Sequence, residues 1–206
     1  MAASSPVRPT SIPGPGLASA LYRLTVRQYD RMIDDGTIAE EERVELVEGL
    51  LATRSSRNRA SIAAGNKALR ILWRIIPPGW HVAKGAAIVI SDWSKPESDL
   101  AVVRGEVEDY DQRNLHGVDV ALVVEIVAAL RVPGLPADRT DRARMYASGG
   151  IPVYWIVNLV DGQLEILSEP GRDGYQSHQV FGCGQDVPVV VAGVEAGWVA
   201  VTDLLP

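Results

Sequence analysis

The chain has 206 residues, of which 47% are hydrophobic and 22% are charged, and its formal net charge is −6 at pH 7. This length suits one domain with an ordinary buried core, and the negative net charge argues against proteins that coat nucleic acid nonspecifically. The sequence contains no run of about 20 apolar residues, so it predicts no membrane span. The single cysteine cannot form an intramolecular disulfide. We therefore expect a cytoplasmic protein without membrane partners.

The first half of the chain predicts a leader, two helices and several strands. Residues 1–18 are rich in Pro, Ser and Gly and are expected to form a disordered leader, with residues 19–206 as a single domain. Thr25 is expected to cap a helix that ends at Asp35-Gly36. Residues 44–53 predict a strand, followed by a polar loop. A long helix is expected over 59–76, with an apolar stripe along it: Ile62, Gly65, Leu69, Leu72 and Ile76.

The second half predicts more strands and one further helix. Strands are expected at about 80–83, 86–91, 99–103, 118–127, 153–158, 163–167, 187–191 and 198–201. Asp161-Gly162 is a strong hairpin signal between two of these strands. A helix is expected over about 138–148, with Asp138 as its N-cap. Strands interspersed with helices predict an α/β or α+β fold around a mixed sheet.

Glu125 stands out because it lies in the continuously apolar segment from Ala121 to Val127. Such a run predicts a strand buried on both faces, where a carboxylate is costly to desolvate unless it is paired or binds a cation. A strand-end glutamate that reaches solvent, or one that pairs with a nearby arginine, is the alternative interpretation.

Further candidate residues could complete a metal site. Asp99 opens another apolar strand, and two carboxylates on adjacent strands can share a Mg²⁺ ion together with water and phosphate oxygens. Glu45 and Glu48 should lie on opposite faces of their strand, so at most one can join the cluster. Arg142 could stabilise the negative charge of a phosphoryl transition state. The alternative is a surface arginine without such a role, which is the commoner case.

The order of several segments resembles the Uma-type putative restriction endonuclease family of the PD-(D/E)XK nuclease superfamily. The segments are RVELVEG (43–49), PESDLAVV (96–103), LVVE (122–125), the DR…YA helix (138–147) and GIPVYWIV (150–157). The resemblance implies a restriction-endonuclease-like fold, with a mixed central sheet flanked by helices and a C-terminal hairpin extension. It also implies DNA as the substrate and a homodimer, because two active sites can address two strands.

The resemblance also implies roles for particular residues. Asp99 and Glu125 would be the metal ligands, with Glu45 as an accessory acid. Mg²⁺, or alternatively Mn²⁺, would generate the attacking water and stabilise the leaving oxygen. The active-site lysine of the family corresponds here to Arg142, which keeps the positive charge but cannot deprotonate to act as a base.

Two alternatives to a DNA-cutting enzyme remain at this point. The arginine at position 142 and the apolar residues 127–129 after Glu125 favour a catalytically degraded relative that binds nucleic acid or a partner protein without cleavage. An unrelated small-molecule enzyme has little support, since the chain contains no glycine-rich phosphate loop and no nucleophile elbow.

A basic stripe on the long helix could bind phosphates locally, even though the negative net charge of the whole molecule repels nucleic acid. A solvated helix face explains the same pattern equally well. The stripe consists of Arg59, Lys67, Arg70 and Arg74, and the preceding loop adds Arg54 and Arg57.

Overall fold

The computed structural model describes residues 21–54, 58–128 and 139–206. The expected leader at 1–18 and the expected N-cap Asp138 lie outside these residues. No helix in the described ranges is long and apolar enough to span a membrane.

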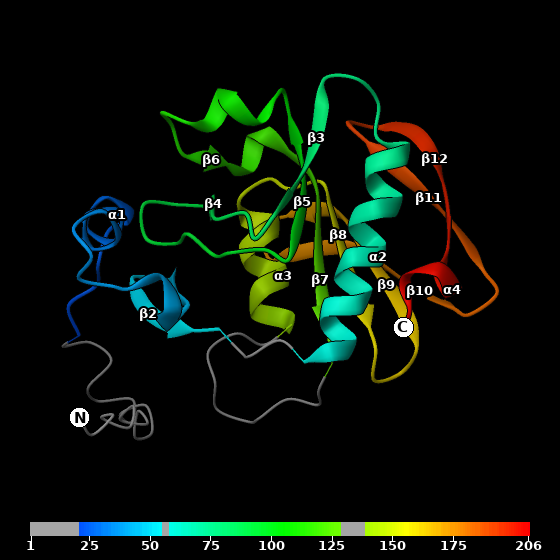
Figure 1. The fold of residues 1–206 in the computed structure, drawn as a ribbon, viewed down its shortest axis with the longest axis horizontal. Helices are drawn as coiled ribbons and strands as arrows, with labels where there is room; N and C mark the ends of the chain where they lie inside the picture. Colours follow the sequence, from blue (N-terminus) through cyan, green and yellow to red (C-terminus); the bar gives the residue numbers. More distant parts are fainter. Residues whose placement is uncertain (1–20, 55–57, 129–138) are drawn as a thin grey trace.

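A six-stranded mixed sheet forms the centre of the fold, as the sequence predicted (Figure 1). Its strand order is β10-β9-β8-β7-β5-β3, and β7 and β8 are parallel while every other neighbouring pair is antiparallel. The strands are β3 (Trp80–Lys84), β5 (Leu100–Arg104), β7 (Val120–Val127), β8 (Val153–Asn158), β9 (Gln163–Gly171) and β10 (Gly174–Gly182). The edge strand β10 was not predicted, because its largely polar residues are half-buried or exposed and lack a buried alternating pattern.

The two faces of the sheet are covered by different elements, and Figure 1 shows α2 and α3 on opposite sides of the central strands. One face packs against α2 (Arg59–Ile75), the hairpin β11–β12 (Asp186–Val191 and Val194–Ala200) and α4 (Val201–Leu204). The other face packs against α3 (Arg139–Ser148) and a short parallel pair, β4 (Ile88–Val89) with β6 (Leu115–His116). Short 3₁₀ turns cover Val107–Tyr110 and Gly117–Asp119.

The segment 44–53, predicted as one strand, is instead a hairpin of β1 (Val44–Val47) and β2 (Leu50–Thr53). Glu48 and Gly49 form its turn with φ of 48° and 78°. Positive φ at both turn residues matches the twist of the flanking strands. Helix α1 (Val26–Asp34) precedes the hairpin with the predicted Thr25 cap, and a 3₁₀ turn (Glu40–Glu42) connects them.

The predicted apolar stripe on α2 is wrong in part. Ile62 is 46% exposed, and the buried residues of the helix are Ser61, Ala64, Ala68 and Leu72. Three of these side chains are small, which lets the helix approach the sheet closely. A prediction from hydrophobicity alone therefore placed the sheet-facing side of α2 about one residue too far along the helix.

The core beneath β7 should carry much of the free energy of unfolding. Leu122 is fully buried in the centre of the sheet, so Leu122→Ala is expected to destabilise the protein by about 2–5 kcal/mol in urea denaturation. Leu51→Ala, at a position 43% exposed on β2, is the matched control and should cost less than about 1 kcal/mol. Equal losses in the two variants would contradict this assignment of the core.

Candidate active site

Asp99 and Glu125 lie opposite one another at one end of the central sheet. Leu100 pairs with Val124 in the antiparallel β5–β7 ladder, so the residues one step beyond this pair face each other. The backbone N–H of Ile126 donates to Asp99 Oδ2 at 2.8 Å. Both carboxylates share the α3 side of the sheet with Ala101 and Val123, as strand alternation requires. The structure thus brings together the two acids that the sequence singled out.

The β1–β2 hairpin adds a third carboxylate to this pair. Glu45 is 2% exposed, and its Oε2 accepts a hydrogen bond from the backbone N–H of Glu97 at 3.1 Å. Glu48 lies in the turn, with its side chain 77% exposed. One of the two hairpin acids therefore joins the cluster, and the other faces solvent.

Helix α3 delivers a cation and a hydroxyl to the same place. The Arg142 guanidinium donates to Glu45 Oε1 at 2.5 Å and to Glu125 Oε1 at 3.0 Å. The Tyr146 hydroxyl, one helical turn further along, donates to the same Glu125 oxygen at 2.7 Å. Residue 142 is thus the inward-facing cation of the cluster rather than a surface arginine.

Arg54 is a second cation of the cluster, and the sequence interpretation missed this role by assigning it to a phosphate-binding loop. Its side chain is 7% exposed and forms ion pairs with three acids. Nη1 contacts Glu97, Nη2 lies 3.4 Å from Asp99 Oδ1, and Nε lies 3.8 Å from Glu45 Oε2. A usable signal was its place directly after β2, which returns the chain to the end of the hairpin that holds Glu45.

The described members of the cluster carry more negative than positive charge. Four carboxylates, on Glu45, Glu97, Asp99 and Glu125, face the guanidinium groups of Arg54 and Arg142. If every group is ionised, the formal sum is −2.

Burial raises the pKa of Glu125 to about 7 from its usual 4.5. Arg142 opposes this shift and the nearby Asp99 adds to it. Burial also raises the pKa of the Tyr146 phenol well above its usual value, so this group acts as a neutral donor. Desolvation would lower the pKa of Arg142, but Glu125 and the other oxygens around it outweigh this effect and hold its pKa well above the usual value.

These carboxylates would suit a Mg²⁺ ion that has only one or two protein ligands better than a metal ion held by three or more protein side chains. Among the described residues, no group of three or more His, Cys, Asp or Glu side chains is arranged to hold a metal ion. Mg²⁺ is commonly bound by one or two carboxylates, with water and phosphate oxygens completing its shell. Asp99 and Glu125 supply two such carboxylates, facing each other across one ladder.

The predicted basic stripe does not reach this cluster, because α2 covers the opposite face of the sheet. Lys67 Nζ donates to the backbone carbonyl of Leu205. Arg59, Arg70 and Arg74 are exposed on the helix, and Arg57 lies outside the described residues.

Comparisons with known proteins give a consistent result. The family model described as Uma2, putative restriction endonuclease, matches residues 26–202. A crystal structure of a putative nuclease belonging to DUF820 from Anabaena variabilis ATCC 29413 superposes with a TM-score of 0.67 at 14% identity, covering 88% of this chain and 97% of that one. This likeness confirms the predicted fold class. No curated protein matches the sequence.

The raised pKa of Glu125 makes the metal-free protein sensitive to pH. Between pH 4.5 and about 7 the unfolded chain loses this proton while the folded protein keeps it, so raising the pH favours unfolding. We expect a loss on the order of 3 kcal/mol across this window and no further loss from this group above it. Urea denaturation in EDTA measures the effect.

Glu125→Gln removes the ionisable group and should flatten this pH dependence. The control Glu48→Gln changes an exposed glutamate and should keep the wild-type slope. A wild-type slope in Glu125→Gln would contradict the prediction.

Proposed function

We propose that this chain, which belongs to the Uma2 family of putative restriction endonucleases, is a metal-dependent endonuclease that hydrolyses phosphodiester bonds in DNA. The observation that carries the proposal is the buried acid cluster at the end of the β5–β7 ladder. Asp99 and Glu125 face each other there across one ladder, and two carboxylates so placed can share one divalent cation.

Asp99 and Glu125 would hold Mg²⁺, and Mn²⁺ could replace it because both cations prefer oxygen ligands. When bound, the ion would lower the pKa of the attacking water and stabilise the leaving oxygen. The hydrogen bond from Ile126 N–H fixes the orientation of the Asp99 carboxylate, and the bond from Tyr146 fixes that of Glu125. Glu45 would act as an accessory acid, since it contacts the cluster through Arg54 and Arg142 and leaves the metal to the other two carboxylates.

Arg142 would contact the scissile phosphate once DNA is bound. Its guanidinium lies against Glu125, one of the two proposed metal ligands, and would stabilise negative charge on a phosphate bound beside them. It cannot serve as the general base, because its pKa is far above neutrality. The base would instead be a carboxylate of the cluster or a metal-bound water.

A second candidate function is DNA binding without cleavage. It is favoured by the ion pairs of Arg142 with Glu45 and Glu125 and of Arg54 with Asp99, which partly neutralise the acids without any metal. Both candidates predict DNA binding, so cleavage distinguishes them.

Plasmid cleavage with Mg²⁺ or Mn²⁺ tests the proposed function. We expect wild-type protein to cut, and Asp99→Asn to reduce the rate by at least about 100-fold through loss of a metal ligand. The control Asp92→Asn changes an exposed aspartate in a nearby turn and should cut at the wild-type rate. Absence of cleavage by folded wild-type protein with either metal would overturn the proposal in favour of binding without cleavage.

Substitution of Arg142 tests whether this residue assists or blocks the chemistry. Arg142→Gln should lower the rate by roughly 100- to 1,000-fold, as expected when a preorganised charge at the reacting phosphate is removed. Arg142→Lys, which keeps the charge, should retain more activity than Arg142→Gln and guards against a folding defect. Arg144→Gln, exposed on the same helix, is the matched control. A faster rate in either Arg142 variant would mean that the arginine blocks the acids.

A further inference from the structure

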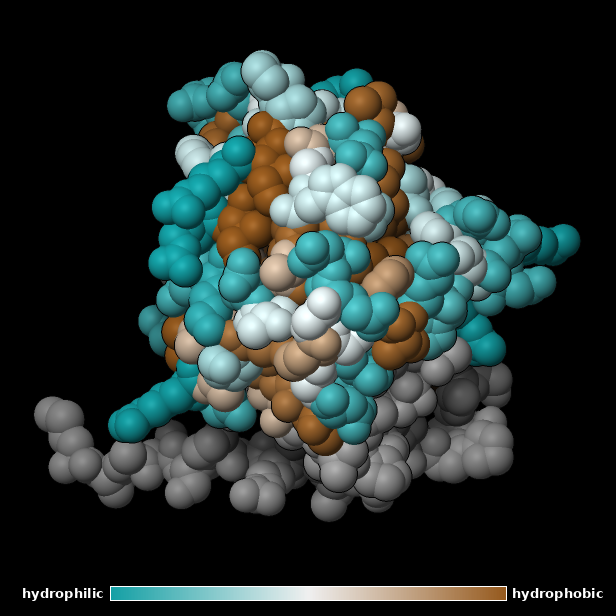
Figure 2. All heavy atoms as spheres, turned by 90° about the vertical axis from the view of Figure 1, so that its right-hand side faces the viewer, coloured by the Kyte–Doolittle hydropathy of each residue, from teal (hydrophilic) through white to brown (hydrophobic). Residues whose placement is uncertain are grey.

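A groove with an aromatic centre lies on the face of the sheet opposite the carboxylate cluster, between α2 and the edge strand β3. Its volume is about 450 Å³. Figure 2 looks onto this side of the molecule and shows hydrophobic surface exposed among hydrophilic side chains. The lining residues come from α2 (Asn66, Leu69, Arg70, Trp73 and Arg74) and from β3 (Val82 and Lys84).

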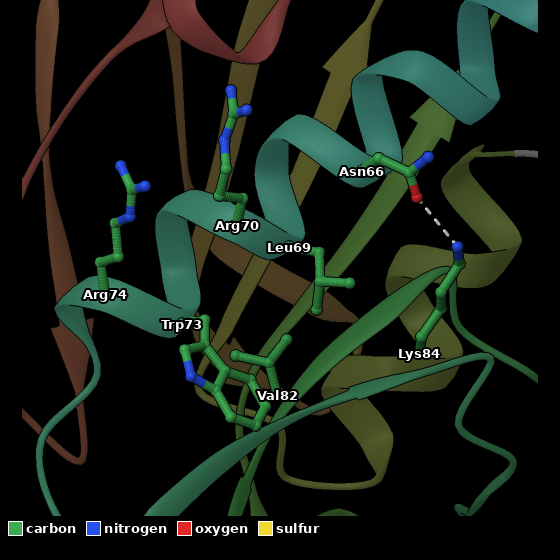
Figure 3. Close-up of a pocket in the computed structure, with 7 residues that line it drawn as sticks. All are labelled: Asn66, Leu69, Arg70, Trp73, Arg74, Val82 and Lys84. Carbon is green, nitrogen blue, oxygen red and sulfur yellow. Dashed lines mark hydrogen bonds between the residues drawn. The ribbon is translucent and has the colours of Figure 1, made fainter.

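The groove combines a flat apolar surface with positive charge. Trp73 is 63% exposed, and in Figure 3 its indole lies beside Val82. Three of the lining side chains are cationic and none of those described is acidic. Figure 3 shows the side chains of Arg70 and Arg74 projecting from α2 on the side away from Trp73 and Val82, at the rim of the groove. Lys84 donates to Asn66 at 3.0 Å at the other end.

This composition selects among possible occupants. An exposed indole offers a stacking surface to any nucleobase, and cations along a groove attract a phosphate backbone. A lipid surface would need a larger continuous apolar patch, and an acidic peptide would leave the indole without a flat partner. The local positive charge also contrasts with the net charge of −6, so the groove is a cationic region on an acidic protein.

The groove and the carboxylate cluster meet at the same end of the sheet. Lys84 pairs with Leu100, the residue after Asp99, and the N–H of Gly85 donates to the carbonyl of Asp99 at 3.1 Å. Among the described residues, β3 is the edge strand of the sheet, so a nucleic-acid strand that contacts both regions would pass around β3.

We propose that the α2–β3 groove binds an unpaired DNA strand, with a base stacked on Trp73 and phosphates contacted by Arg70, Arg74 and Lys84. The groove lies outside the proposed catalytic site, so it binds whether or not the strand is later cut. In the active enzyme it holds single-stranded DNA that leads around β3 to Asp99 and Glu125.

Fluorescence anisotropy with a labelled oligo(dT) strand in EDTA tests the groove without cleavage. We expect Trp73→Ala to weaken binding at least about fivefold, while Trp73→Phe retains most of the affinity because it can still stack. The combined change Arg70→Gln and Arg74→Gln should reduce the slope of log K against log salt by about 1.4, as expected for two lost phosphate contacts to a single strand.

The matched control is Trp93→Ala, which removes another exposed tryptophan, 44% exposed, in a turn beside the β1–β2 hairpin. Unchanged oligo(dT) binding in Trp73→Ala, or an equal loss in Trp93→Ala, would overturn the inference. If polyglutamate displaces the DNA at the same concentration of negative charges, the groove binds acidic proteins instead, and the inference is overturned. Failure of wild-type protein to bind oligo(dT) while it still cuts plasmid would refute the groove alone, whereas binding by wild-type protein without cleavage would refute the nuclease alone.

Discussion

The burial of the Glu125 carboxylate in a central strand is the constraint on which the arrangement of this protein depends. The side chain is 10% exposed, and a buried charge without partners costs several kcal/mol. Arg142 and Tyr146 of α3 bond to the same oxygen of Glu125, and Arg142 also bonds to Glu45 of the hairpin. One unfavourable group thus requires the helix and the hairpin to assemble against the same face of the sheet.

These contacts also have a chemical consequence. Among the described residues, Arg54 and Arg142 form ion pairs with four acids of the cluster. Burial keeps a proton on Glu125 up to a pH of about 7. A proton and an arginine therefore compete for the same oxygens, and the proposed metal ion would compete with both. In this respect the stability of the metal-free fold and the proposed chemistry depend on the same contacts.

The two faces of the sheet have opposite electrostatic character at one end of the molecule. Acids gather on the α3 side, whereas Arg70, Arg74 and Lys84 line the groove on the α2 side. The edge strand β3 separates the two regions and contacts the backbone of Asp99. Such a division allows a chain with a net charge of −6 to present a cationic surface on the face opposite its acid cluster.

The sequence by itself predicted the central strands and the Asp161-Gly162 hairpin, because alternation and turn chemistry are local properties. That Asp99 and Glu125 share a face follows from the register of β5 against β7, which the structure supplies. Only the tertiary structure decided where Arg54 points. Its partners Glu97 and Asp99 lie 43 and 45 residues away along the chain, and they come within reach only when the hairpin folds over the sheet. An ion pair depends on distance in space, and no local pattern encodes a contact that the long-range packing creates.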